Sequence, residues 1–207
     1  MKKPKKSVAR GRPPLSATMR AAERLRISGL AEDLFGANGF ESVSMRRLAD
    51  AAGCTTMTLY AYFENKADIL REIWSRMLED LFDELEVMAP GIQRPEPRLH
   101  AICARYVQYW LDHPERYRMV FMTPGVSQND VGVFVASERA AARYNLFFDT
   151  LARCAANADP GHLRLRGETL ICGLHGIAHN HVTISQYPWE SAAEHVNCLV
   201  RALTKFD

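Results

Sequence analysis

The 207-residue sequence predicts an all-α protein made of two helical units, a small N-terminal one and a larger C-terminal one. Apolar residues recur at three- and four-residue spacing along most of the chain, whereas no alternating segment bounded by hairpin turns occurs. Proline and glycine breaks divide this pattern into separate helices. With 47% hydrophobic and 24% charged residues, the composition is that of an ordinary globular protein.

Residues 1–16 are predicted to form a disordered basic arm, because residues 2–14 are rich in Lys, Arg and Pro and poor in apolar side chains. Within the arm, Arg10-Gly11-Arg12-Pro13 is similar to the core of an AT-hook, which lays two arginines along a narrow A·T-rich minor groove. Arg10 and Arg12 are therefore candidate DNA-binding residues. The alternative is a solvated basic tail that only adds non-specific attraction.

A first helix is predicted over residues 17–37 and is ended by Asn38-Gly39. Its apolar positions fall on one face at i, i+3, i+4, i+7 and i+8: Ile27, Leu30, Ala31, Leu34 and Phe35.

Two short helices hinged at one glycine follow. Ser44 can cap the first of them, and Gly53 can end it in a left-handed conformation without steric cost. Thr55 can cap the second, which extends to about Phe63. This arrangement is a helix-turn-helix, so residues 17–65 are predicted to be a DNA-binding domain.

A fourth helix is predicted over residues 66–87, capped by Asn65 in an approximate capping box. It continues from the first unit into the second, residues 66–207, and belongs to both. Pro90-Gly91 and the prolines at 95 and 97 are expected to end it and form a linker. Five more helices are expected between later breaks, near residues 98–112, 114–122, 128–157, 162–185 and 189–206.

Residues 18–73 carry about a dozen signature positions in one register: Phe40, Ser44, Leu48-Ala49, Ala52-Gly53, Leu59-Tyr60, Tyr62-Phe63, Lys66 and Leu70. This set resembles the DNA-binding region of the tetracycline-repressor (TetR) family. Cys54 departs from the pattern where an aliphatic residue is usual, and Met57 where glycine is frequent. The resemblance implies a dimeric, ligand-responsive transcriptional regulator, and repression is the family expectation.

The exposed edge of the third helix is small, polar and nearly uncharged, which suits base edges in a major groove. The family pattern assigns phosphate contacts to Ser44, Tyr60, Tyr62 and Lys66. It also places the start of the first helix near the DNA backbone, which suits Arg20 and Arg24, although solvated arginines are an equal alternative. The candidate DNA-binding residues outside the arm are Ser44, Met45, Arg46, Thr55, Thr56, Met57, Thr58, Tyr60, Tyr62 and Lys66.

Many aromatic residues lie between residues 106 and 148. Most are expected to be core, because aromatic side chains at helical spacing usually are. The resemblance nevertheless implies a small-molecule pocket in this region, apolar with few polar groups. The candidate ligand-binding residues are Tyr106, Trp110, Met122, Phe134, Asn145, Phe148 and His175. The last two helices are expected to form a homodimer by the same resemblance.

Metal and enzyme chemistry have weak support. Cys172, His175 and His179 share one helix face, and two histidines four residues apart can bind zinc, but no nearby acidic residue completes a ligand set. Histidines packed in a core or an interface are the commoner outcome. No hydrolase, metalloprotease or nucleotide-binding motif occurs, so no cofactor, metal or catalytic residue is predicted.

Charge, cysteines and hydropathy agree with a cytoplasmic DNA-binding protein. Residues 1–72 hold thirteen Lys or Arg and eight Asp or Glu, a net charge of +5, against +2 for the whole chain. Five scattered cysteines without a CxxC pair indicate reduced thiols. No segment is long and apolar enough for a membrane span or a signal peptide. A protein-binding adaptor of the same architecture and an enzyme remain the alternatives.

Overall fold

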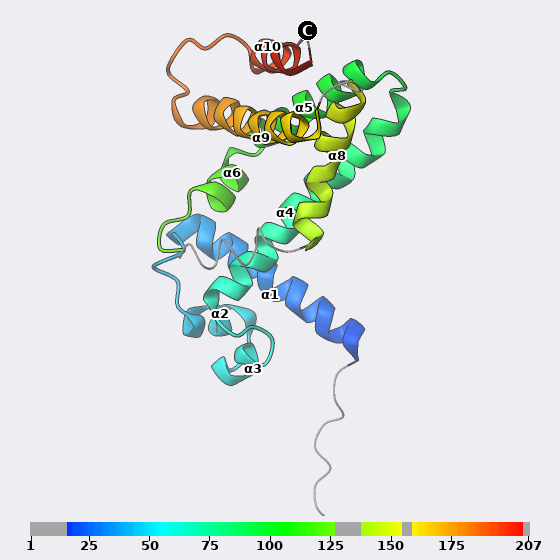
Figure 1. The fold of residues 1–207 in the computed structure, drawn as a ribbon. Coiled ribbons are helices and arrows are strands. Elements are labelled where there is room, and N and C mark those ends of the chain that lie inside the picture. Colours follow the sequence, from blue (N-terminus) through cyan, green and yellow to red (C-terminus); the bar gives the residue numbers. More distant parts are fainter. Residues whose placement is uncertain (1–15, 127–137, 155–158, 205–207) are drawn as a thin grey trace, which may run out of the picture.

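The computed structural model describes residues 16–126, 138–154 and 159–204, and these ranges contain helices and no strand (Figure 1). The all-α prediction is confirmed. The elements are α1 (Ala17–Asn38), α2 (Met45–Ala52), α3 (Thr56–Tyr60), α4 (Lys66–Met88), the 3-10 turn η1 (Ala89–Gly91), α5 (Pro95–Asp112), α6 (Pro114–Phe121), α8 (Glu138–Cys154), α9 (Pro160–Thr183) and α10 (Ala192–Thr204).

The predicted helix caps of the N-terminal unit are present. The side chains of Ser44, Thr55 and Asn65 accept hydrogen bonds from the amides three residues later, at 3.2, 3.1 and 2.8 Å. Such caps satisfy amides that a helix start leaves free. Gly53 adopts φ 67° and ψ 31°, the left-handed conformation expected at the hinge between α2 and α3.

Two hydrophobic cores share one helix. The first core joins α1, α2 and α3 to the part of α4 that runs to Met77. The second begins at Leu78 and includes α5, α6, α8, α9 and α10. In Figure 1, α4 runs without interruption from beside the helix-turn-helix into the C-terminal bundle. Helix α4 therefore belongs to both cores.

Helix α6 also contacts both cores, near the point on α4 where the first core ends. The indole N–H of Trp74 on α4 donates to the Met119 carbonyl on α6, with 2.8 Å between nitrogen and oxygen. Tyr109 on α5 donates to the Met77 carbonyl at 3.0 Å. Met119 itself packs against the N-terminal core, so α6 is held to the midpoint of α4.

Two helix starts differ from the sequence expectation. The segment at residues 95–97 is the first turn of α5 and not a linker, because proline has no N–H and the first turn of a helix needs none. The final helix begins at Ala192 and not near 189. Trp189 instead closes the preceding loop, where its indole N–H donates to the Ile184 carbonyl at 2.9 Å.

Several expectations fall outside the described residues. They are the basic arm with Arg10 and Arg12, the segment 128–137 with Phe134, the end of the helix expected to reach 157, and the last residues of the chain. Within the described ranges, no helix is both long and apolar enough to cross a membrane.

Candidate functional site

The outer face of α3 exposes apolar and hydroxyl-bearing side chains. Met57 is 84% exposed and Tyr60 is 52% exposed, while Leu59 between them is fully buried. Leu59 anchors the helix from behind, together with the buried ring of Phe63. The side chains that the sequence assigned to base edges therefore point to solvent from a fixed backbone.

The two exposed threonines at the start of α3 are coupled. The Thr55 and Thr58 hydroxyl oxygens lie 2.8 Å apart, and Thr55 also accepts from the Thr58 amide. One of the two hydroxyl protons forms the hydrogen bond between these threonines, and the other can be donated to an acceptor outside the protein. Thr56 is half-buried, with a smaller accessible surface than its neighbours.

Arginines of α1 bind the carboxyl ends of α2 and α3. Arg20 donates to the Ala61 carbonyl, and Arg24 donates to the Tyr62 carbonyl. Arg26 donates to the Ala52 carbonyl at 2.9 Å. Helix ends leave such carbonyls unpaired and carry partial negative charge, so guanidinium groups stabilise them.

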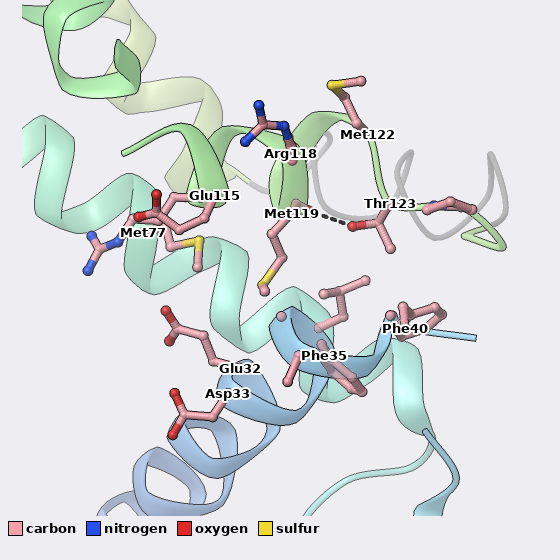
Figure 2. A pocket seen from close by; sticks show the side chains of 16 residues that line it. Glu32, Asp33, Phe35, Phe40, Met77, Glu115, Arg118, Met119, Met122 and Thr123 are labelled. Atoms are coloured by element: carbon pink, nitrogen blue, oxygen red, sulfur yellow. Dashed lines mark hydrogen bonds between the residues drawn. The ribbon is translucent and has the colours of Figure 1, made fainter. Parts of the chain in front are cut away.

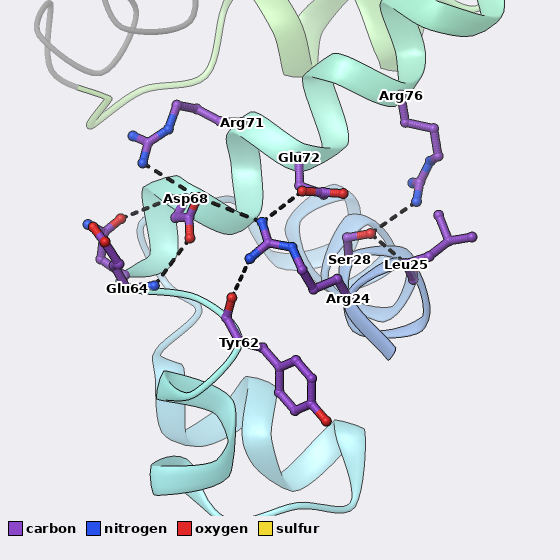
Figure 3. Close-up of polar contacts among 10 residues, drawn as sticks. Arg24, Leu25, Ser28, Tyr62, Glu64, Asp68, Arg71, Glu72 and Arg76 are labelled. Carbon is purple, nitrogen blue, oxygen red and sulfur yellow. Dashed lines mark hydrogen bonds and ion pairs between the residues drawn. The ribbon is translucent and has the colours of Figure 1, made fainter. Parts of the chain in front are cut away.

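Arg24 joins three elements at once (Figure 3). Besides Tyr62, it forms an ion pair with Glu72 of α4 at 2.8 Å and lies 4.2 Å from the centroid of the Phe63 ring. The Arg24 guanidinium thus has its partners within the protein. The family-based expectation placed Arg24 near the DNA backbone. Its partners in the structure lie on α4 and in the segment that follows α3.

Lys66 is also bound within the protein. Its ammonium group donates to the Phe40 carbonyl at 2.6 Å and to the Glu41 carbonyl at 3.3 Å, and it lies 4.2 Å from the Phe40 ring centroid. Burial lowers the pKa of Lys66, and the Glu41 carboxylate partly opposes this shift. Two of its three N–H donors are occupied, so one is left for a phosphate.

The remaining candidates on this surface flank α3. Ser44 and Arg46 are exposed at the start of α2, and Met45 and Tyr62 are half-buried. The Tyr62 ring lies beneath the Arg20 guanidinium, whose central carbon is 5.4 Å from the ring centroid. Helices α2 and α3, which carry most of these candidates, pack against each other.

A second group of candidates meets inside the C-terminal bundle. The Tyr106 hydroxyl lies 2.7 Å from His175 Nε2 and 3.3 Å from the Tyr144 hydroxyl, and Tyr106 is fully buried. Trp110 packs edge-on to Tyr106 at 6.2 Å between ring centroids. Phe121 contacts both Trp110 and His175, with centroids at 5.2 and 4.7 Å. We call these residues the aromatic–histidine cluster.

Burial sets the protonation of this cluster. It lowers the pKa of His175 and raises that of Tyr106 and Tyr144, so the neutral form of each is favoured. A second tyrosine and histidine also meet nearby, since the Tyr117 hydroxyl lies 3.3 Å from His179 Nδ1. The sequence pointed to Tyr106, Trp110 and His175 but missed Tyr144 and Phe121, for which aromatic spacing was the only signal.

The other predicted ligand-binding residues are not in this cluster. Met122 is 42% exposed and lies in a groove at α1, Asn145 is exposed on α8, and Phe148 packs half-buried beside Gly167 of α9. Over the described residues, no three His, Cys, Asp or Glu side chains are grouped to hold a metal ion. Cys172 is exposed, whereas His175 is engaged with Tyr106.

Two family profiles match the chain. Residues 27–73 match the profile described as bacterial regulatory proteins, tetR family, and residues 99–204 match the profile described as tetracyclin repressor-like, C-terminal domain. The HTH-type transcriptional repressor KstR2 of Rhodococcus jostii (strain RHA1) is 33% identical over 82 residues, which cover 39% of this chain and 40% of that repressor.

Solved structures share the fold. A TetR/AcrR-family transcriptional regulator from Thermobifida fusca YX-ER1 superposes with a TM-score of 0.62 at 21% identity, covering 88% of this chain and 97% of the other. The fatty acid degradation regulator FadR from Bacillus halodurans gives a TM-score of 0.68 at 16% identity, covering 88% and 94%. At these identities the likeness concerns the fold alone.

Proposed function

Because the chain belongs to the tetR family of bacterial regulatory proteins, we propose that it is a dimeric transcriptional repressor that binds a palindromic DNA operator and is released by a small-molecule effector. The observation that supports DNA reading most strongly is the outer face of α3. Met57 and the threonine hydroxyls are exposed there, while three α1 arginines and the caps hold the backbone behind them.

The contacts divide into two kinds, since phosphate contacts position a protein and base contacts specify sequence. The Met57 side chain can contact a thymine methyl, and the free threonine hydroxyl can bond a base edge or a phosphate. Ser44, Arg46, Tyr60 and Tyr62 supply donors at the edges of this surface. Lys66 can add its one remaining N–H.

Dimerisation is proposed through α9 and α10, which lie side by side in Figure 1. The likeness to the TetR family supports this face, because the last two helices have the position that builds the dimer's four-helix bundle in that family. Two subunits would place two α3 helices in successive major grooves about 34–36 Å apart.

The effector site is proposed at the aromatic–histidine cluster. Buried hydroxyl and imidazole groups within an apolar core are the polar groups that a ligand pocket needs. The Trp110 indole packs edge-on to Tyr106 in this cluster, and we propose its N–H as a further donor to an effector oxygen. Phe121 and Tyr117 belong to α6, so a change at this site would move that helix. Helix α6 is in turn bonded to α4, through the Trp74 indole and the Met119 carbonyl.

The effector can release DNA only to the extent that it binds the two dimer states with different affinity. Repression is supported by the relative from Rhodococcus jostii, which is a repressor. A gel shift with fragments from the region upstream of the protein's own gene tests DNA binding. A retarded band that survives competitor DNA is expected, and failure on every upstream fragment would favour the protein-binding alternative.

A further inference from the structure

Two histidine side chains meet where α10 packs on α9. His181 lies in the last turn of α9 and His195 in the first turn of α10. Their ring centroids are 5.7 Å apart, with 70° between the ring planes. The two helices lie side by side in Figure 1, so the loop that joins them brings these imidazoles together.

Both rings have an unpaired nitrogen. The Nε2 atoms of His181 and His195 are buried and have no hydrogen-bond partner among the described residues. Buried polar atoms are normally paired with a protein group, a water molecule or an ion. An imidazole with its proton on Nδ1 presents an electron pair at Nε2, so one small electrophilic partner could satisfy both rings.

The separation of the rings fits a shared transition-metal ion. Imidazole nitrogens bind Zn²⁺ at about 2.0–2.1 Å, which places the metal about 3.2 Å from the ring centroid. Two imidazoles on one ion then have centroids about 5–6.5 Å apart, for nitrogen–metal–nitrogen angles between tetrahedral and linear. The observed 5.7 Å falls in this range. An edge-on ring contact has a similar spacing, but it would not account for two unpaired nitrogens.

The surroundings favour neutral imidazoles. Both histidines line a groove of about 290 Å³ together with Asn180 and Trp189, and its lining in the described structure includes no Lys, Arg, Asp or Glu. The larger groove at α1, about 580 Å³ in volume, differs because acidic and basic side chains line it together (Figure 2). Burial lowers the pKa of His181, and the neighbouring His195 lowers it further. A neutral imidazole is the form that binds a metal.

Trp189 covers the pair. Its ring centroid lies 6.1 Å from that of His181 and 6.3 Å from that of His195. The indole N–H donates to the Ile184 carbonyl at 2.9 Å, so this donor is not directed at either imidazole.

We propose that His181 and His195 bind one divalent ion of the class that imidazole prefers, such as Zn²⁺, Ni²⁺ or Cu²⁺, through their Nε2 atoms. No third His, Cys, Asp or Glu side chain joins them among the described residues. The Asn180 amide oxygen, which lines the same groove, and water would complete the coordination sphere. The ion would fasten α10 and the loop before it to α9, and this site is separate from α3 and from the aromatic–histidine cluster.

The test is calorimetric titration of the full chain with NiCl₂ at neutral pH, with MgCl₂ as the control salt because Mg²⁺ prefers oxygen ligands. We expect one Ni²⁺ per chain and no binding of Mg²⁺. His181→Gln and His195→Gln should each weaken Ni²⁺ binding at least about tenfold. The double variant should lose little more, since two ligands of one ion act as a unit.

Two variants control for other metal-binding side chains of these helices. His179→Gln removes the histidine that is four residues from His175, and Cys198→Ser removes an exposed thiol of α10. Both should bind Ni²⁺ like the wild type.

Trp189 gives a second readout that reports location. Paramagnetic Ni²⁺ and Cu²⁺ quench the fluorescence of a nearby indole, whereas Zn²⁺ does not. The quench should be lost in Trp189→Phe, which keeps a ring over the two histidines, while calorimetry still shows Ni²⁺ binding.

The proposal is overturned if Ni²⁺ does not bind the full chain, if Mg²⁺ binds as tightly, or if His181→Gln and His195→Gln bind Ni²⁺ like the wild type. Loss of binding in His179→Gln or Cys198→Ser, or a quench that persists in Trp189→Phe, would place the ion elsewhere and overturn it as well. None of these measurements uses DNA, so their failure would leave the proposed repressor function standing.

Discussion

Arg24→Met tests whether α1 positions the reading helix. The substitution keeps the apolar stem of the side chain but removes its bonds to Tyr62 and Glu72 and its contact with the Phe63 ring. A hydrogen bond to a charged group contributes about 1.5–3 kcal/mol, and a cation–π contact about 0.5–1 kcal/mol. Water can replace part of this loss, because the Arg24 side chain is 27% exposed and that of Glu72 is 37% exposed. We expect the free energy of unfolding to fall by about 2 kcal/mol.

The salt dependence of operator binding shows whether Arg24 positions α3 or contacts a phosphate itself. Operator affinity should fall about tenfold in Arg24→Met while the slope of log affinity against log salt stays that of the wild type, because no phosphate contact is lost. Arg46→Ala is the control, since Arg46 is exposed beside α3 and its loss should reduce the slope by about 0.9 per contact. Fluorescence anisotropy over a salt series measures both. A slope reduced in Arg24→Met as much as in Arg46→Ala would refute the positioning role.

Three further changes test other parts of the account. Met57→Ala should alter the preferred DNA sequence more than the overall affinity, because the side chain is 84% exposed on the reading face; an unchanged selected-site motif would contradict this. Gly53→Ala should lower stability by about 1 kcal/mol, since an alanine in the left-handed conformation is strained, and urea denaturation measures it. His175→Gln should reduce the loss of stability between pH 7 and pH 5. Burial lowers the pKa of His175 in the folded protein. As the pH decreases below about 6.5, the unfolded chain therefore takes up a proton before the folded protein does, and the free energy of unfolding decreases. Equal losses in the variant and the wild type would rule His175 out as the cause.

Local sequence signals were sufficient for the helix-turn-helix. Ser44, Thr55 and Asn65 act on amides three residues away, and Gly53 acts through its own backbone, so neighbours along the chain determine these features. The start of α5 lies earlier than the sequence predicts, because proline can end a helix but is equally suited to its first turn. The family resemblance supplied what local patterns lack, namely how the helices of the two units are arranged.

Long-range partners could not be predicted. Arg24 meets Tyr62 and Glu72 across 38 and 48 residues, and nothing near Arg24 in the sequence distinguishes it from a solvated arginine. Lys66 was assigned to phosphate, but it also bonds the carbonyls of Phe40 and Glu41, which packing alone brings close. The groove at α1 that Met122 lines likewise joins side chains from α1, α4 and α6, which are separated widely in the chain.

Selection of binding sites from random double-stranded DNA by the purified full chain tests the central claim most directly. Two α3 helices related by a two-fold axis must read the same bases on opposite strands. The selected sequences should therefore contain an inverted repeat, and the spacing of its half-sites should match about one helical turn or somewhat more. Enrichment of a single asymmetric half-site, or no enrichment at all, would contradict the account of a dimeric operator-binding repressor.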